Sequence, residues 1–265
     1  MPAGLFMWAL SFAIFAAVKW MTWWTARGRL TPSVGRSLAY LAAWPGMDAD
    51  AFLNSSHRPA RPGVQQWIWA LWKTALGVAL LWFVARRVPV QYSLLRGWIG
   101  LFGLIFLLHF GSFHLIALFW QDNGVDAKPI MFNPAASVTL SEFWGKRWNL
   151  GFRQLAHEFI FRPLRKRTNA AFAGLMVFVA SGLIHDLVIS FPARGGYGLP
   201  TAYFLLQGLA VIFERSSLAA RIGLQKQVAA RIFTLLVTAA PVFWLFHPPF
   251  VRRVILPFLH AIRSL

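Results

Sequence analysis

The sequence contains no cysteine and only eight acidic residues among 265. Without thiols the chain forms no disulfide, no thiolate zinc site, no iron–sulfur cluster and no cysteine nucleophile. Charged residues of both signs amount to 13% of the chain, against roughly 25% in soluble domains. Together with 58% hydrophobic and 16% aromatic residues, this shortage of charge indicates a membrane protein.

Several catalytic signatures are also missing. The chain has no G-x-S-x-G serine elbow, no phosphate-binding G-x-x-x-x-G-K-[ST] loop and no H-E-x-x-H zinc motif. His109 and His114 are five positions apart and would point in different directions on a helix, which is unlike the paired histidines of metal or haem sites. We therefore expect no metal and no tightly bound cofactor.

The net charge of +18 comes from 26 Lys and Arg residues, most of them in short loops between apolar runs. This distribution argues against a nucleic-acid partner and is typical of membrane topology signals. The loops after the first, third and fifth apolar runs are the most basic, which predicts that they are cytosolic and that the N-terminus is outside. The excess of Arg over Lys and the many Ala residues favour a bacterial source, hence an integral multi-pass protein of the inner (plasma) membrane.

Four apolar windows approach or exceed the roughly 20 residues that a membrane-spanning helix needs. Three further windows are shorter, and the first window lacks the basic start of a cleaved signal peptide, so we expect it to be retained. The sequence predicts an all-α, polytopic integral membrane protein with six or seven membrane segments in one domain, residues 1–265. The long windows are 4–24, 64–85, 97–120 and 170–191, and the short ones are 199–213, 232–246 and 254–262.

Residues 121–169 are expected to form a cytosolic or interfacial loop and helix. Between Leu140 and Leu164, aromatic and basic residues alternate in a pattern that suits the headgroup level of a bilayer. The stretch from Ser141 to Asn149 gathers a carboxylate, two cations, two tryptophans and an asparagine. On residue types alone, an interfacial amphipathic helix is the favoured interpretation.

Asp186 is the only carboxylate placed inside a predicted span, and His185 precedes it about 22 Å from the start of that span. Ser181 is four positions earlier on the same helix face, near enough to fix the imidazole tautomer. Asp186 is turned by about 100° and so need not touch His185; an Arg, Lys19 or Lys73 of another span is the alternative partner. Two interpretations of this pair remain open: a buried cluster of polar side chains that joins helices, and a catalytic site.

Two motifs carry a family resemblance. Residues 143–149 (FWGKRWN) and 182–186 (GLIHD) resemble the wax synthase branch of the membrane-bound O-acyltransferases, or MBOAT family. Residues 44–48 (WPGMD) and 124–129 are similar to loops of the same branch, and the likeness extends from about Leu38 to Ser216. Family members usually carry more spans, which implies either a simplified tunnel or one completed by another copy in a homo-oligomer or by a partner.

The resemblance implies acyl transfer from acyl-CoA, as co-substrate, to a hydroxyl group. It assigns His185 as the catalytic base and Asn149 as the residue that orients a reactant or stabilises the oxyanion. These residue types suit the chemistry, because imidazole accepts a proton near neutral pH and an amide donates a hydrogen bond. Since the chain has no Cys and no serine elbow, we expect direct transfer without an acyl-enzyme.

Other residues near the two motifs are candidates for substrate binding and support. Lys146 and Arg147, with Trp144 and Trp148, are the candidates for binding the anionic donor. Ser181 and Asp186 are expected to support His185. The basic cluster at 162–167 is expected mainly to anchor the chain to anionic lipid.

Three functions remain open from the sequence. The first is an acyltransferase in the lipid bilayer acting on a lipophilic alcohol, and the second is an O-acetyltransferase acting on a sugar, polymer or secondary metabolite. The third, from another class, is a transporter or lipid-binding protein in which His185 and Asp186 relay protons.

Overall fold

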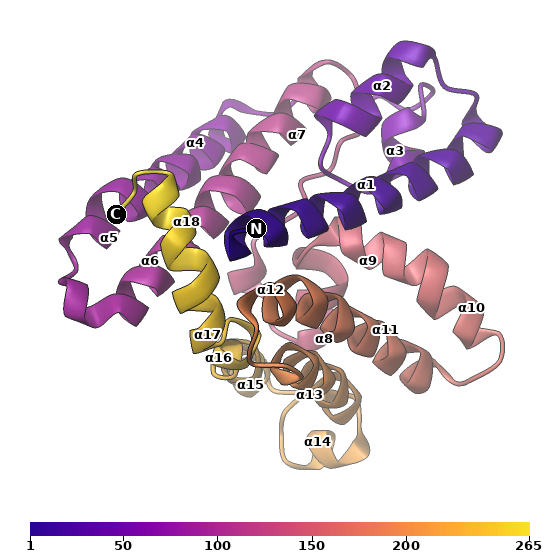
Figure 1. Ribbon diagram of the computed structural model, residues 1–265. Coiled ribbons are helices and arrows are strands. Elements are labelled where there is room, and N and C mark those ends of the chain that lie inside the picture. Colours follow the sequence, from indigo (N-terminus) through magenta and orange to yellow (C-terminus); the bar gives the residue numbers. More distant parts are fainter. The chain divides into compact units, whose positions relative to one another are not determined.

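The computed structural model describes residues 1–265 and consists of helices without β-strands. Four helices begin at recognisable caps: Ser33, Asp48, Asn169 and Ser216 each accept a backbone N–H from the first turn of the helix that follows. The α-helices (Figure 1) are α1 (Ala3–Leu30), α2 (Val34–Ala43), α3 (Ala49–Leu53), α4 (Val64–Ala79), α5 (Ala85–Arg87), α6 (Ser93–Ile105), α7 (Phe113–Asp122), α8 (Leu140–Glu142), α9 (Leu150–Ala156), α10 (Arg162–Arg165), α11 (Ala170–His185), α12 (Phe191–Ala193), α13 (Leu199–Glu214), α14 (Ser217–Arg221), α15 (Gln227–Ala239), α16 (Val242–Leu245), α17 (Pro248–Phe250) and α18 (Leu256–Ala261).

Short segments of wider or tighter helix join several of these elements. The π-helical segments are η1 (Leu80–Val84), η3 (Phe106–Ser112), η5 (Phe143–Arg147), η6 (His157–Phe161), η7 (Asp186–Ser190) and η8 (Val251–Ile255), and the 3₁₀ segments are η2 (Val90–Tyr92) and η4 (Pro134–Ala136).

Five continuous helices are long and apolar enough to cross a membrane: Ala3–Leu30, Val64–Arg87, Val90–Asp122, Ala170–Ala193 and Gln227–Leu245. A sixth apolar helix, Leu199–Glu214, has 16 residues. The polytopic, all-helical fold expected from the sequence is therefore confirmed. The span expected at 232–246 is longer than the sequence indicated, because its helix begins five residues earlier, at Gln227.

The chain divides into two compact units. The first comprises Met1–Trp8, Phe132–Asn149 and Arg153–Pro257, and the second comprises Ala9–Met131, Leu150–Phe152 and Phe258–Leu265. Each unit contains its own set of apolar helices.

In the first unit, α11 and α13 lie side by side, as Figure 1 shows. Small residues let the two backbones approach. A Cβ added to Gly182 would lie 2.6 Å from Thr201 Cα, and one added to Gly208 would lie 2.8 Å from the Leu175 side chain. Close packing through small residues is the usual way in which membrane helices associate, because lipid supplies no hydrophobic force between them. This helix pair carries the candidate site described below.

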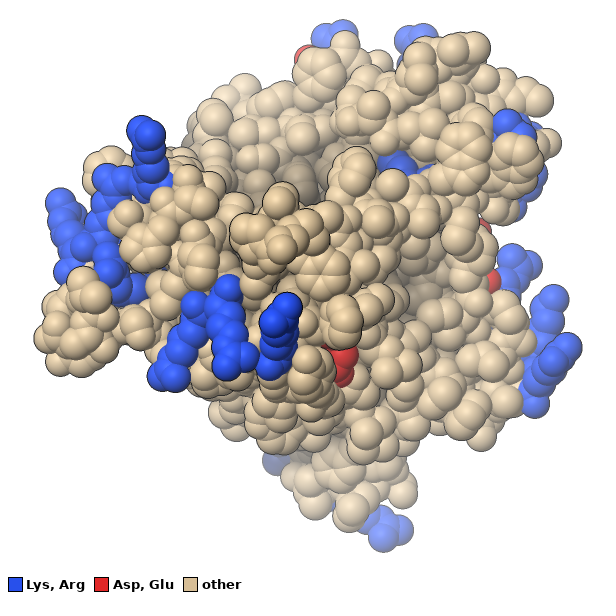
Figure 2. All heavy atoms as spheres, in the orientation of Figure 1, with Lys and Arg blue, Asp and Glu red and all other residues tan.

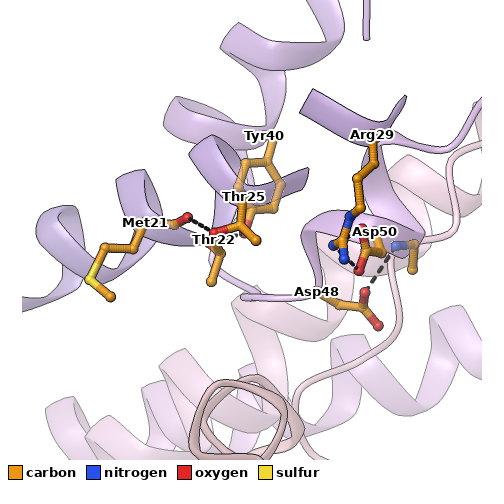
Figure 3. A network of polar contacts seen from close by, with 8 residues as sticks. Met21, Thr22, Thr25, Arg29, Tyr40, Asp48 and Asp50 are labelled. Carbon is orange, nitrogen blue, oxygen red and sulfur yellow. Dashed lines mark hydrogen bonds and ion pairs between the residues drawn. The ribbon is translucent and has the colours of Figure 1, made fainter. Parts of the chain in front are cut away.

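In the second unit, the end of α1 is joined to α2 and α3 by polar contacts (Figure 3). The Thr22 and Tyr40 hydroxyls are 2.7 Å apart, and Arg29 forms an ion pair of 2.8 Å with Asp50. Asp48 accepts the backbone N–H of Ala51 and so begins α3. These contacts hold the ends of three helices around an apolar core that contains Tyr40, Trp44 and Phe52.

Lys19 lies almost completely buried in the second unit. Its ammonium donates to the carbonyl of Gly46 and stands 3.4 Å from the centre of the Tyr40 ring. Lys19 therefore serves the 44–48 loop, and the structure does not place it as the partner of Asp186 considered from the sequence. Gly46 itself has no room for a side chain, because an added Cβ would lie 2.6 Å from the Trp44 ring.

The crossing of α4 with η3 in the second unit gives a test of this packing. A Cβ on Gly77 would lie 2.4 Å from the backbone nitrogen of Leu107, whereas one on Gly174, in α11, meets nothing within 4 Å. We expect Gly77→Ala to lower the thermal unfolding midpoint in detergent, with a cost of about 1–3 kcal/mol from overpacking. The matched Gly174→Ala should leave the midpoint unchanged or raise it, because alanine favours helix. If the two substitutions change the unfolding midpoint equally, the close approach of α4 and η3 at Gly77 is contradicted.

Candidate functional site

His185 is the last residue of α11, at the point where the helix widens into η7. Pro192, seven residues on, has no N–H to donate, and helices often bulge or kink near such a residue. The Nδ1 atom of His185 lies 2.7 Å from the backbone carbonyl oxygen of Ser181. A carbonyl only accepts hydrogen bonds, so Nδ1 carries the proton and Nε2 keeps a free lone pair. The backbone of Ser181, and not its hydroxyl, fixes this tautomer.

Asp186 faces the start of α13. Its carboxylate accepts the backbone N–H groups of Gly198 at 2.8 Å and Thr201 at 3.0 Å, and also the Thr201 hydroxyl. The first N–H groups of a helix have no partner within the helix, and a carboxylate there satisfies them and complements the helix dipole. Asp186 forms no ion pair with any Lys or Arg, so the cationic partner considered from the sequence is replaced by a helix N-terminus.

The hydrogen bonds of Asp186 continue to His247. The Nδ1 of His247 accepts the backbone N–H of Phe250 at 3.2 Å, which leaves Nε2 to donate to the Ser190 hydroxyl at 3.1 Å. Ser190 in turn donates to Asp186 at 2.8 Å. Ser190 and His247 are fully buried, and through Asp186 this chain of hydrogen bonds joins the end of α11, the start of α13 and the start of α17.

The 140–164 segment, expected as one interfacial helix, is helical but interrupted. After α8 and η5 the chain is extended at Trp148, and Asn149 adopts the left-handed conformation with φ of 42° before α9 begins. Asparagine tolerates this conformation better than most residues, and its carbonyl accepts the N–H of Arg153 at 3.0 Å. The break gives Asn149 a conformational role that the sequence did not reveal.

Trp144 brings the FWGKRWN motif to the α11–α13 pair. Its ring lies 5.7 Å, centre to centre, from both Phe178 and Phe204. Phe204 in turn lies 4.4 Å from the His185 imidazole. A single aromatic ring therefore separates the motif from the histidine, and both belong to the first unit.

Two polar residues of α13 hold the motif in this position. The buried amide of Gln207 accepts the Trp144 indole N–H at 3.3 Å and donates to the carbonyl of Val237 at 2.7 Å. At the end of the same helix, Glu214 accepts the backbone N–H of Leu140 at 2.6 Å and the Ser141 hydroxyl at 2.8 Å. The start of the motif segment is thus fixed to α13 at two points.

The two cations of the motif differ in their surroundings. Arg147 forms an ion pair of 2.6 Å with Glu142, and both side chains are largely covered. Lys146 is exposed and forms no ion pair. Trp148 stacks on Phe143 with ring centres 5.4 Å apart. Lys146 is therefore the cation of this segment that is available to an anionic ligand, while Arg147 is already neutralised.

Sequence reasoning missed three residues that position this site. Gln207 is a polar residue inside an apolar helix, and Ser190 is four positions after Asp186, so both carried a detectable signal. His247 lies between the predicted apolar windows 232–246 and 254–262. Its role depends on a contact across 57 positions that no local pattern reveals.

Comparison with known proteins shows a similarity over the central part of the chain. Residues 127–206, which include the motif, His185 and Phe204, match the model of the "Membrane bound O-acyl transferase family". Over this stretch the chain is similar to the membrane-bound O-acyltransferases. A long-chain-alcohol O-fatty-acyltransferase of Simmondsia chinensis is 27% identical over 49% of this chain, and the match covers 40% of that relative. A probable long-chain-alcohol O-fatty-acyltransferase 2 of Arabidopsis thaliana is 32% identical over 49% of this chain and 41% of the relative.

These relatives share modest identity with the chain and are named as acyltransferases that act on long-chain alcohols. An acyl-CoA–sterol O-acyltransferase of Arabidopsis thaliana is also similar, at 24% identity over 48% of this chain and 40% of its own length. The chain thus matches less than half the length of these three relatives. The matched part contains the site residues up to Phe204, whereas Gln207, Glu214 and His247 lie outside the family model.

The Glu142–Arg147 pair predicts a pH dependence of stability. The N–H of Val138, followed by Arg147, holds the pKa of the Glu142 carboxyl below its ordinary value. A carboxyl whose pKa falls on folding stabilises the protein above its ordinary pKa, about 4.3, and this stabilisation is lost as pH falls further. Between about pH 5 and pH 3, we expect the thermal midpoint of Glu142→Gln to fall less than that of the wild type. Asp122→Asn, at an exposed carboxylate without an ion pair, should behave as the wild type, and a Glu142→Gln curve parallel to the wild type would contradict the pair.

Proposed function

We propose that this protein transfers an acyl group from acyl-CoA to the hydroxyl of a lipophilic alcohol within the membrane. One observation carries the proposal. The Ser181 carbonyl holds His185 as the tautomer whose Nε2 can accept a proton, and the family motif packs one ring away. The similarity to long-chain-alcohol O-fatty-acyltransferases supports the choice of reaction and of a lipophilic acceptor.

In this proposal Nε2 of His185 removes the hydroxyl proton of the acceptor as its oxygen attacks the thioester carbonyl. A carbon–oxygen bond forms and the carbonyl oxygen gains negative charge. When this tetrahedral intermediate collapses, the carbon–sulfur bond breaks, and the imidazolium returns its proton to the departing thiolate. The products are an ester and free coenzyme A, and the enzyme returns to its starting state without an acyl-enzyme.

Asn149 is assigned to the oxyanion or to the orientation of a reactant, because an amide N–H stabilises developing negative charge. Lys146, exposed and without a carboxylate partner, is assigned to the phosphates of the donor. Trp144 and Trp148 would line the same donor-binding region. Arg147 acts indirectly, by fixing the turn through Glu142.

The hydrogen bonds of Asp186 argue against the alternative hypothesis of a transporter with a proton relay. A proton relay needs a carboxylate that can exchange partners, but Asp186 accepts four hydrogen bonds from Ser190, Gly198 and Thr201. We assign Asp186 to positioning: it holds the start of α13, the helix that carries Phe204 against His185. This assignment favours the transferase over the relay.

The five apolar helices and the family support an integral membrane protein. Within that setting we propose the topology indicated by the basic loops, with the N-terminus outside and the 121–169 segment on the cytosolic side, where acyl-CoA is available. The bacterial inner membrane as location, and a homo-oligomer that completes the tunnel, belong to the same proposal.

The direct test supplies purified protein with radiolabelled palmitoyl-CoA or acetyl-CoA and a panel of alcohols and sterols. We expect ester formation with long-chain alcohols, and we expect His185→Ala to reduce kcat by about 100-fold or more while the protein remains folded. His260→Ala, at an exposed histidine far along the chain, is the matched control and should retain activity. Failure of the wild type to acylate any acceptor, or full activity of His185→Ala, would overturn the proposal.

The two roles of Asn149 can be separated by Asn149→Gly. Glycine accepts a φ of 42° without strain, so the break before α9 should persist while the amide side chain is lost. We expect thermal stability close to the wild type and a fall in kcat of about 100-fold, as for loss of one oxyanion donor. Asn133→Gly, at a second left-handed asparagine with φ of 45°, should keep its activity. If Asn149→Gly is fully active, the residue serves only the backbone turn.

A further inference from the structure

The first unit contains a cavity of about 820 Å³ where the Ala170–Ala193 helix ends. Its wall includes Phe6, Phe191 and Tyr197 together with two arginines, Arg194 and Arg253, and none of its lining residues is acidic. Its volume falls in the range of ligand sites, roughly 300–1,000 Å³. None of the residues assigned to acyl transfer lines it.

The guanidinium of Arg253 is held in place at this cavity. Its Nη1 donates to the carbonyl oxygens of Ala193 at 3.1 Å and of Arg194 at 3.0 Å, the carbonyls that follow the last turn of the span. Arg194 is exposed and forms no ion pair. Figure 2 shows blue side chains gathered over the region where Figure 1 places α12 and α17. Two positive charges, with no acidic residue among the lining, therefore face one concave site.

The apolar part of the wall is also open to a ligand. The rings of Phe6 and Phe191 lie 5.9 Å apart, and Phe191 and Tyr197 are 53% and 63% exposed. Exposed aromatic rings next to cations at the end of a membrane helix match the level of lipid headgroups and the upper part of acyl chains. A small soluble anion would use the arginines but leave these rings without a partner.

We propose that this cavity binds an anionic phospholipid, with its phosphate between Arg194 and Arg253 and its glycerol and upper acyl chains against Phe6 and Phe191. Arginine recognises phosphate through paired N–H donors, and the carbonyl contacts of Arg253 orient its remaining donors in advance. The site requires membrane embedding but not the acyl-transfer reaction, so each proposal stands or fails separately.

The test is native mass spectrometry of the full chain, delipidated in detergent and titrated with phosphatidylglycerol, phosphatidylcholine or oleate. We expect one phosphatidylglycerol to bind at least fivefold more tightly than phosphatidylcholine or oleate. Arg253→Gln should remove most of this preference. Arg252→Gln, its neighbour in η8, makes the same change in charge but does not line the cavity, so it should retain the preference within twofold. Circular dichroism would verify that both variants are folded.

Equal loss in the Arg252→Gln and Arg253→Gln variants would show general charge attraction and overturn the site. Equal binding of phosphatidylglycerol and phosphatidylcholine would overturn the role of charge, and tighter binding of oleate would assign the cavity to a fatty-acid carboxylate instead. Persistent preference in the Arg194→Gln/Arg253→Gln double variant would place the lipid elsewhere on the protein.

Discussion

The carboxylate of Asp186 at the N-terminus of α13 is the interaction on which the site depends. It joins the helix that ends in His185 to the helix that carries Phe204 and Gln207. A carboxylate that is partly withdrawn from water needs hydrogen-bond donors, and here backbone N–H groups and hydroxyls supply them. Because Asp186 is adjacent to His185, any movement of this cap is transmitted directly to the imidazole.

A second set of contacts, also based on α13, determines where the FWGKRWN segment lies. Gln207 holds the Trp144 indole in the middle of the helix, and Glu214 holds the start of α8 at its end. An unpaired amide in an apolar interior costs free energy, so Gln207 keeps Trp144 and the carbonyl of Val237 together. The motif thereby approaches His185 through side-chain geometry and not through sequence proximity.

Much of the fold was visible in the sequence, because apolar runs of about 20 residues have few alternatives to a membrane helix. The long windows appear as helices, and the candidate site residues of the two motifs lie in the same unit. The sequence also singled out Asp186, because a carboxylate inside an apolar run is costly and needs a partner. The sequence did not reveal which group that partner is.

What sequence reasoning could not supply was geometry between distant segments. The sequence indicated a cationic partner for Asp186. In the structure, its partners are backbone N–H groups at the start of α13, which stabilise the carboxylate without the cost of burying a second charge. The interruption at Asn149 was hidden, since one left-handed residue leaves the aromatic and basic pattern of 140–164 unchanged. His247 was missed because it acts through Ser190, from a helix start that the apolar windows did not define.

The central claim is that the reacting carbonyl of the donor lies between the FWGKRWN motif and His185. Photolabelling with an acyl-CoA that carries a diazirine beside its thioester carbonyl tests this most directly, with peptide mapping by mass spectrometry. The account predicts labels on residues 143–149 and around His185 and Phe204, suppressed by excess unlabelled acyl-CoA. Competed labelling confined to the second unit, or to the cavity at Arg194 and Arg253, would contradict it.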